Sequence, residues 1–202
     1  MKKLKFNFLL TSVLTLLVFA SVQAQEFYKV QTSKSKLVVS GTSSLHDWEM
    51  EATDFNAETL IKLNDNAVSE ISRIEFTSPV SGLKSGKRIM DNKTLEALNE
   101  KKFPEIKFSL DNNGEINLMG EKANLTGKLT IAGKTREVKL TVDFDVQNTQ
   151  RFQVTGNVPL KMSDFGVEPP TALMGTVKTD DELVVSFDLE FQKSSDQFTE
   201  NF

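Results

Sequence analysis

The residues best suited to chemistry lie together in one stretch, SSLHDWEME (residues 43–51). It holds the only histidine and the only tryptophan of the 202-residue chain, with an aspartate between them. A histidine beside an acid can form a catalytic pair if the carboxylate orients the imidazole toward a nucleophile. Successive side chains of a strand point to opposite faces, so on a strand His46 and Trp48 would share a face that Asp47 does not. That geometry disfavours a catalytic pair and leaves two interpretations, contacts with a ligand or a purely structural role.

Other polar clusters offer weaker candidates for chemistry. With one histidine and no cysteine, a metal site would depend on carboxylates and amides, which suit Ca²⁺ or Mg²⁺. The runs NDN (64–66) and DNN (111–113) have suitable atoms, but turn formation explains them more simply. Paired carboxylates could hydrolyse glycosides, yet Asp143 and Asp145 are expected on the wet face of a strand and residues 180–182 in a turn. We therefore predict no catalytic residue, no metal and no cofactor.

The elements that would position these residues are mostly strands. Apolar and polar residues alternate over 123–131, 136–146, 152–160 and 183–191, with the turn signal Ala132-Gly133-Lys134 between the first two segments. Alternation with a period of two is typical of antiparallel strands that have one dry and one wet face. The C-terminal half is thus expected to form a long hairpin followed by further strands.

The N-terminal half repeats this pattern less cleanly. Short strands are expected over 27–31 and 37–41, and Trp48, Met50 and Ala52 share one face of another strand. From Phe55 onward the apolar residues take the opposite parity, which predicts a bulge or slip near residues 53–54.

One segment is typical of a helix. Residues 91–101 lie ahead of Pro104, and Asp91 or Asn92 is a suitable N-cap. Leu95 and Leu98, with Ala97, would form its small apolar face. We predict a single short α-helix here.

Roughly eight to ten strands with short connections can close as a sandwich or as an up-and-down barrel. A strand of about 11 residues spans roughly 36 Å, which suits a tall barrel better than a sandwich. An eight-stranded barrel can leave room for one small ligand, and Gly127 and Gly156 on the inward face would widen it. Twelve phenylalanines follow residue 24, and they fit either a filled core or a lined tunnel.

The first 24 residues are typical of a secretory signal peptide. Lys2, Lys3 and Lys5 precede a 13-residue, mostly apolar run from Phe8 to Ala20, and cleavage is expected after Ala24. The run is shorter than the about 20 residues that span a hydrocarbon core. We predict a signal peptide (1–24), one domain (25–193) and a polar tail (194–202), located in the periplasm or, alternatively, outside the cell.

Charge and aromatic content exclude two further classes. Residues 25–202 carry 21 Lys+Arg against 28 Asp+Glu, a balance of −7 that argues against nucleic-acid binding. An outer-membrane barrel would need two girdles of Trp and Tyr, and the chain has one of each. We therefore expect no transmembrane segment in the mature protein.

Three motifs carry a resemblance to a known family. KKFPEIKFSL (101–110), ANLTGKLTIAGKTREVKLTVDF (123–144) and MSDFGVEPP (162–170) resemble the YceI-like family of secreted lipid-binding proteins. The resemblance extends over residues 27–191. It implies an all-β fold, an extended eight-stranded antiparallel lipocalin-like barrel with one short helix. It also implies that the interior holds a long isoprenoid or fatty chain, with a quinone as another candidate.

With the resemblance, the inward residues become candidate ligand contacts. The expected barrel lining is Trp48, Met50, Phe55, Phe76, Phe108, Leu129, Leu140, Phe144, Phe152, Val154, Phe165 and Phe187. The basic cluster KSGKR (84–88) precedes the expected helix, where Lys84, Lys87 and Arg88, with His46, could meet an anionic head group such as pyrophosphate. A solvated loop is the alternative.

The expected function is sequestration or transport of a long-chain apolar lipid. Two alternatives stay open, namely an enzyme that acts at the barrel mouth through His46, and a ligand-free structural or stress-response barrel. Transient contact with a membrane surface and a homodimer are left open as further partners.

Overall fold

The computed structural model describes residues 25–64, 67–110, 115–172 and 174–195, so the expected signal peptide (1–24) and most of the expected tail (196–202) lie outside the described residues. Strands dominate the described part, and α1 is the single α-helix within it. In chain order the elements are β1 (Glu26–Val30), the 3₁₀ helix η1 (Thr32–Lys34), β2 (Lys36–Ser43), β3 (Trp48–Ala52), β4 (Asn56–Asn64), β5 (Ala67–Pro79), η2 (Val80–Gly82), β6 (Leu83–Lys84), α1 (Arg88–Ala97), β7 (Glu105–Leu110), β8 (Glu115–Met119), β9 (Lys122–Ile131), β10 (Lys134–Asn148), β11 (Arg151–Lys161), η3 (Ser163–Phe165), β12 (Thr171–Ala172) and β13 (Val177–Lys193).

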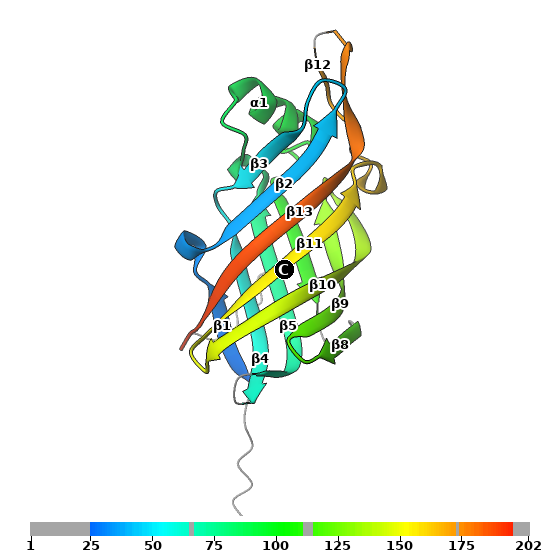
Figure 1. Ribbon diagram of the computed structural model, residues 1–202. Helices are drawn as coiled ribbons and strands as arrows, with labels where there is room; N and C mark the ends of the chain where they lie inside the picture. Colours follow the sequence, from blue (N-terminus) through cyan, green and yellow to red (C-terminus); the bar gives the residue numbers. More distant parts are fainter. Residues whose placement is uncertain (1–24, 65–66, 111–114, 173, 196–202) are drawn as a thin grey trace, which may run out of the picture.

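Eight of these strands close into a barrel, as predicted. The order around the wall is β1-β4-β5-β7-β9-β10-β11-β13, and β13 pairs with β1 to complete the circle. Each pair is antiparallel, and the closing register sets Tyr28 opposite Lys193 and Val30 opposite Phe191. Figure 1 shows the long tilted strands, with α1 and β12 at one end of the barrel and β1 at the other. We call the end that carries α1 and β12 the mouth.

Near the mouth, three more short strands extend one side of the wall. β2 continues the line of β1 along β13, β3 continues β4, and β6 pairs with β3. The strands are interrupted at η1, at residues 53–55 and at η2, and the second interruption explains the predicted change of parity. The freed backbone groups find partners there, because Thr53 N–H and its hydroxyl both donate to the Gly82 carbonyl at 2.9 Å.

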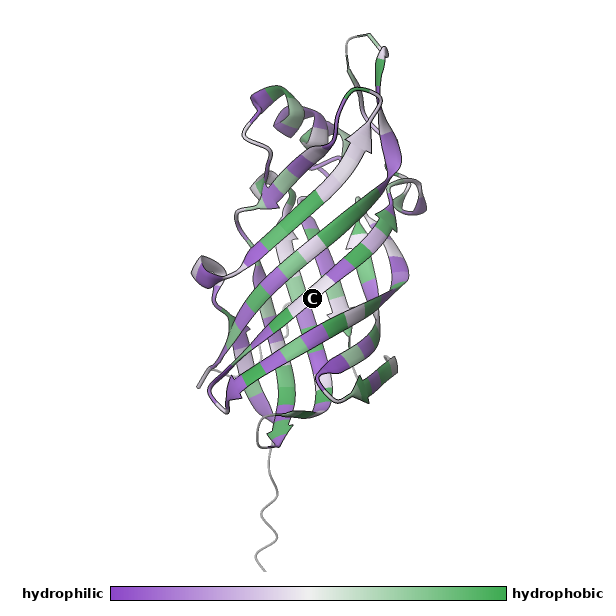
Figure 2. Ribbon diagram, in the orientation of Figure 1, coloured by the Kyte–Doolittle hydropathy of each residue, from purple (hydrophilic) through white to green (hydrophobic). Residues whose placement is uncertain are grey.

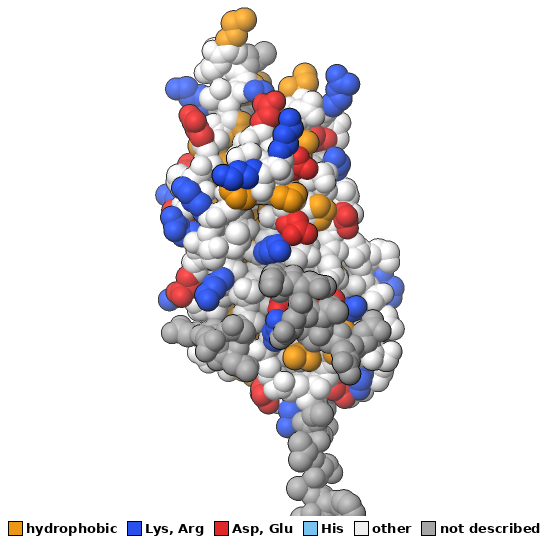
Figure 3. All heavy atoms as spheres, turned by 180° about the vertical axis from the view of Figure 1, so that it is seen from behind, with side chains coloured by type: hydrophobic (Ala, Val, Ile, Leu, Met, Phe, Trp, Pro, Cys, Tyr) orange, Lys and Arg blue, Asp and Glu red, His pale blue; other side chains and the backbone are white. Residues whose placement is uncertain are grey.

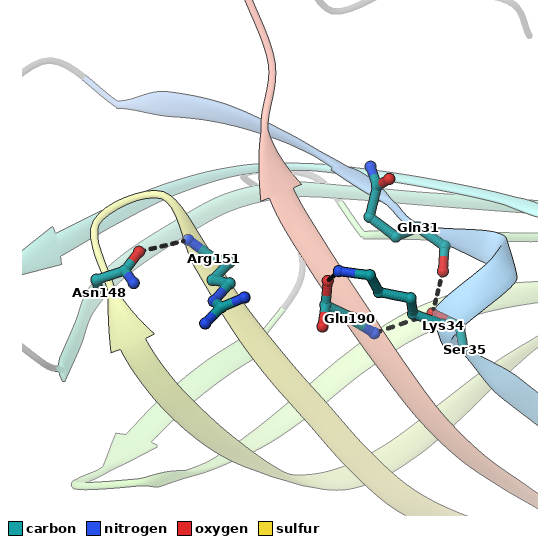
Figure 4. A network of polar contacts seen from close by, with 6 residues as sticks. All are labelled: Gln31, Lys34, Ser35, Asn148, Arg151 and Glu190. Carbon is teal, nitrogen blue, oxygen red and sulfur yellow. Dashed lines mark hydrogen bonds and ion pairs between the residues drawn. The ribbon is translucent and has the colours of Figure 1, made fainter.

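The first interruption is fixed to the wall by a polar network. The Ser35 hydroxyl donates to the Gln31 carbonyl (2.8 Å) and accepts from Glu190 N–H (2.9 Å). Lys34 Nζ lies 2.7 Å from Glu190 Oε1, so η1 is held against β13 (Figure 4). These bonds keep β1 and β2 on one line although the strand itself is broken.

The helix differs from its predicted bounds. It runs from Arg88 to Ala97 rather than over 91–101, and Lys87 is the N-cap residue in place of Asp91 or Asn92. The Asp91 carboxylate instead accepts from the hydroxyl of Ser85 (2.6 Å) and from its N–H (2.8 Å). These bonds hold the pKa of Asp91 below its ordinary value and tie the loop before the helix to its first turn.

Aromatic rings lie over glycines on the inner wall. A Cβ on Gly156 would be 2.5 Å from Phe187 Cζ, and one on Gly41 would be 2.4 Å from the Trp48 ring. Gly156 and Gly41 stand directly opposite Phe187 and Trp48 in the strand register. Each ring thus lies against the neighbouring strand, in the space that a side chain at the glycine position would fill. The ring therefore extends less far into the interior, which stays wider. The ring of Phe108 lies against Gly127 in the same way.

The barrel end opposite the mouth is closed by an aromatic cluster, which we call the floor: Tyr28, Phe144, Phe152 and Phe191. The Phe152 and Phe191 rings stack with centroids 5.1 Å apart, and Tyr28 meets Phe152 edge-on at 5.0 Å. Tyr28 is 0% exposed, and its hydroxyl lies 2.9 Å from both Glu26 Oε2 and the Thr149 carbonyl oxygen. Burial, and next the hydrogen bond to Glu26, raise the pKa of Tyr28.

Tyr28 is the only tyrosine in the chain, so its titration can be followed directly. We expect the folded protein to show no tyrosinate absorbance as the pH passes the ordinary value of about 10. The unfolded chain releases the proton first, so the free energy of unfolding should fall as the pH rises above about 10. Glu26→Gln should lower the pKa only in part, because burial is the larger cause. Ordinary titration near pH 10 in the folded protein would contradict this arrangement.

The glycine beneath a ring can be tested with Gly156→Ala. The added methyl group should push the Phe187 ring into the interior and destabilise the fold by about 1–3 kcal/mol. Denaturant unfolding measures the change. In a Phe187→Ala background the same substitution should cost much less, and an equal cost in both backgrounds would show that the ring is not the cause.

Candidate functional site

The barrel encloses a cavity of about 820 Å³. Its wall is built from the inward residues of the barrel strands and of β2, β3 and β6, and its lower limit is the floor, where Phe144, Phe152 and Phe191 line it. Figure 2 shows the alternation of hydrophobic and hydrophilic residues along each strand that produces this wall. The cavity reaches the surface at the mouth, because the exposed residues Leu45, His46 and Ile89 also line it.

Eleven of the twelve lining residues proposed from the sequence stand in this wall: Trp48, Met50, Phe76, Phe108, Leu129, Leu140, Phe144, Phe152, Val154, Phe165 and Phe187. Phe55 does not line the cavity. It lies in the interruption between β3 and β4, is buried, and packs with its ring centroid 6.1 Å from that of Phe76. Residues 53–55 belong to no strand, so the alternation that turns Ala57 and Thr59 toward the cavity does not extend to Phe55.

Part of the lining was not predicted from the sequence. Met90, Thr94, Ala97 and Leu98 of the helix segment face the cavity, whereas Leu95 does not line it. Their spacing of four, three and one residues marks a helical face, and it begins at Met90, one residue before the expected helix. The Thr94 hydroxyl contacts Met50 Sδ at 3.3 Å, which places this face against β3.

A short loop completes the wall beside the helix. Met162, Phe165 and Val167 form a small core around η3, against which Trp48 and Leu98 pack. Gly166 adopts a φ of +66°, in the left-handed region, and Val167 N–H donates to the Met162 carbonyl at 3.0 Å. This tight turn directs Phe165 inward, as its place in the MSDFGVEPP motif suggested.

The charged side chains that line the cavity are all basic. Lys87, Arg88, Lys93 and Lys161 line it, and no aspartate or glutamate of the described residues does. Lys161 is engaged by Glu182 at 3.0 Å, which raises the pKa of its ammonium group. The remaining three cations come from α1 (Arg88 and Lys93) and from Lys87, the residue before it.

Two of the four proposed head-group contacts belong to this basic set, namely Lys87 and Arg88. Lys84 does not line the cavity. It lies exposed on β6, opposite Glu51 of β3. Lys84 belongs to the two-residue strand β6, whereas Arg88 begins α1. The sequence cluster KSGKR is therefore divided between two elements.

His46 is exposed at the rim, and its geometry is not that of a catalytic pair. Its Nδ1 lies 2.7 Å from the backbone carbonyl oxygen of Asp47, so the main chain rather than the carboxylate orients the ring. The loop around it is fixed by Ser43, whose hydroxyl donates to the His46 carbonyl at 2.7 Å. The indole N–H of Trp48 donates to the Thr42 carbonyl at 3.0 Å, which leaves its ring in the cavity wall.

The acidic candidates take part in surface contacts. Asp143 lies 2.7 Å from Lys122 Nζ, and the Asp181 carboxylate accepts from Ser163 N–H (2.8 Å) and its hydroxyl (2.6 Å). The Ser163 bonds lower the pKa of Asp181. Across the described residues, no three His, Cys, Asp or Glu side chains gather as metal ligands would. Over the same residues, no helix is long and apolar enough to span a bilayer.

Several solved structures share this architecture. BcnA from Burkholderia cenocepacia is 24% identical with a TM-score of 0.65, and the match covers 80% of this chain and 98% of that one. A polyisoprenoid binding domain from Saccharophagus degradans, implicated in plant cell wall breakdown, is 10% identical with a TM-score of 0.63, covering 83% and 98%. The YceI protein of Campylobacter jejuni is 18% identical with a TM-score of 0.55, covering 71% and 82%.

At these identities the likeness concerns the fold. A search of curated proteins found no match. The model of the YceI-like domain, however, matches residues 28–191, which reach from within β1 to within β13, the two strands that close the barrel. The chain therefore belongs to the YceI-like domain family.

Proposed function

We propose that the protein is a carrier that holds a long apolar chain, such as a polyisoprenoid, within the barrel and away from water. The observation that carries this proposal is the apolar cavity of about 820 Å³, which runs from the floor to the mouth. Ligand sites commonly measure about 300–1,000 Å³ and bury most of their ligand. A polyisoprenoid binding domain among the structural neighbours supports the same class of ligand.

The physical basis is transfer of the chain from water to an apolar enclosure. A cavity lined by apolar groups stays dry and accepts an apolar guest. Enclosing about 300 Å² of ligand surface at about 25 cal/mol/Å² contributes roughly 7 kcal/mol before the costs of association. Holding of this strength is reversible, as a carrier requires. The family and the cavity support binding rather than catalysis.

The cavity gives the ligand a direction. At the closed end the floor presents the phenyl rings of Phe144, Phe152 and Phe191, whereas Lys87, Arg88 and Lys93 stand near the mouth. A chain with an anionic head group would therefore enter tail first and leave its head among these cations, where charge-assisted hydrogen bonds are available. His46 is placed to contact the same group.

The proposed place of action is the periplasm, with the extracellular space as the alternative. The support is the sequence of residues 1–24, which is typical of a cleaved signal peptide. A water-filled compartment beside a membrane is where a carrier for a water-insoluble chain is useful.

The inner and outer faces of the wall offer a matched test. Val39 and Val185 stand opposite each other in the register and line the cavity, whereas their neighbours Val38 and Val184 belong to the outer face. Val39→Phe with Val185→Phe should fill the cavity and weaken binding of a dansyl-labelled prenyl chain at least tenfold, or about 1.4 kcal/mol. Energy transfer from Trp48, the only tryptophan, provides the signal.

Val38→Phe with Val184→Phe serves as the control and should leave the affinity unchanged. Denaturant unfolding should show that both double variants are folded. Equal affinity for the inner and outer variants would place the probe outside the barrel and reject the cavity as its site.

A second measurement concerns the native ligand. Protein isolated from its source without detergent should release, into organic solvent, a molecule with a prenyl or acyl chain that mass spectrometry detects in near-stoichiometric amount. The inner double variant, isolated in the same way, should release much less. Protein that carries no such molecule and binds no prenyl probe would contradict the proposal.

A further inference from the structure

Exposed hydrophobic side chains gather at the mouth. Five large hydrophobic residues are exposed among the described residues, and three of them are Leu45 (65%), Ile89 (75%) and Met174 (108%). These three come from separate segments: the β2–β3 loop, the first turn of α1 and the β12–β13 loop. All three segments lie at the mouth end of the barrel in Figure 1. From behind, Figure 3 shows hydrophobic side chains projecting at this end, with Lys and Arg and some Asp and Glu around them. We call these three residues the apolar tips.

Two of the tips are held in place by hydrogen bonds. Ser43 braces the turn that carries Leu45, since its hydroxyl donates to the His46 carbonyl and accepts from Leu45 N–H at 3.3 Å. Ser44 joins this turn to the base of the β12–β13 loop through its N–H to the Lys178 carbonyl (2.9 Å) and its hydroxyl from Lys178 N–H (3.0 Å). The Leu45 turn and the β12–β13 loop are therefore joined, whereas Ile89 is carried separately by α1.

Met174 occupies an unusual backbone position. Its φ is 56°, in the left-handed region that a residue with a side chain rarely adopts, and the turn is closed by Gly175 N–H donating to the Ala172 carbonyl at 3.1 Å. A polar residue or glycine would suit an exposed turn of this shape better than methionine does. The fold thus presents a large apolar side chain to solvent at a backbone cost, which is a feature of functional positions.

The opposite end of the barrel is different in character. Its β10–β11 turn consists of polar residues, and the Asn148 side chain accepts from the N–H groups of Gln150 (2.8 Å) and Arg151 (3.2 Å) (Figure 4). This turn is therefore polar, although Met119 (47% exposed) ends β8 away from the mouth.

Basic residues accompany the tips. Ile89 directly follows Lys87 and Arg88, and Lys93 lies one turn further along the helix. Apolar side chains among lysines and arginines are typical of segments that lie in the interface of an anionic bilayer. Leu45, Ile89 and the three basic residues also line the cavity, so this part of the surface that would contact a bilayer is continuous with the path of the ligand.

We propose that the mouth docks on the surface of a bilayer that contains anionic lipid, with the apolar tips in the interface and Lys87, Arg88 and Lys93 against the head groups. This inference deepens the proposed function, on which it rests for its purpose: a chain that is insoluble in water passes between bilayer and cavity without crossing water. The docking itself has its own readout and does not need the cavity to be occupied.

Vesicle flotation tests the docking. Delipidated protein should float with vesicles of phosphatidylglycerol and phosphatidylcholine, and much less with phosphatidylcholine alone or at high salt. The triple variant Leu45→Ser, Ile89→Ser and Met174→Ser should lower the bound fraction at least tenfold. Lys87→Gln with Arg88→Gln and Lys93→Gln should remove the preference for the anionic vesicles.

Met119 provides the matched control, since it is exposed (47%) on β8, away from the mouth. Met119→Ser should leave flotation unchanged, whereas Met174→Ser should reduce it while leaving solution binding of the dansyl prenyl probe intact. The docking would be overturned if the wild-type protein did not float with anionic vesicles. It would also be overturned if Met119→Ser and Met174→Ser reduced flotation equally.

The cavity-filled variant Val39→Phe with Val185→Phe separates the two proposals. It should float as the wild type does while it fails to bind the probe. Probe binding without flotation would reject the docking and retain the carrier, and flotation without probe binding in the wild type would do the reverse.

Discussion

The cavity depends on one geometric constraint, that successive side chains of a strand stand on opposite faces of the wall. Because the wall is closed, one face of every strand is turned away from water and the other toward it. Leu183, Val185, Phe187, Leu189 and Phe191 of β13 all line the cavity. A shift of a single residue in any register would exchange the two faces. The tight registers between long strands, ten residue pairs for β9 and β10 and eleven for β11 and β13, therefore determine the chemistry of the interior.

An open interior is costly, since side chains around a void lose contacts that a filled core would supply. The fold offsets this cost at its ends. The floor stacks its aromatic rings at one end, and the small core of Met162, Phe165 and Val167 packs beside α1 at the other. Between them, rings such as Phe187 lie against glycines and gain close contact with the wall itself. The chain has no cysteine, so these contacts and the strand pairing hold the barrel together.

Much of the fold could be predicted from the sequence because the period of two is strong in the long strands. Strand length favoured a barrel over a sandwich and the family motifs indicated the same fold, while the alternation identified residues such as Leu140 and Phe152 as inward. The helix bounds were wrong, because Asp91 resembles an N-cap in sequence while its carboxylate binds Ser85. The prediction that Phe55 lines the cavity failed for a related reason, because the alternation of residue types alone cannot locate the exact residues at which a strand breaks.

The mouth was the least predictable part. Lys93 and Lys161 join the basic set from elements far apart in the sequence, and their common place depends on how α1 packs over the barrel. Lys84 does not belong to the basic set, because its position in β6, opposite Glu51, turns its side chain away from the cavity. The exposure of Leu45, Ile89 and Met174 could not be inferred either, because their types are those of ordinary core residues. Residues in loops have no periodicity that reports their direction.

The closing pair of strands has a consequence for the order of folding. β1 and β13 lie near the two ends of the described chain, whereas most other pairs in the wall join strands that are close in sequence. Hairpins such as β9–β10 can form early. Pairing β1 with β13 costs more conformational entropy, because it closes a loop that contains all the chain between them. The compartment thus comes into existence only after the final strand has been synthesised and docked. Until then the apolar row is open to solvent, and such intermediates are prone to aggregate.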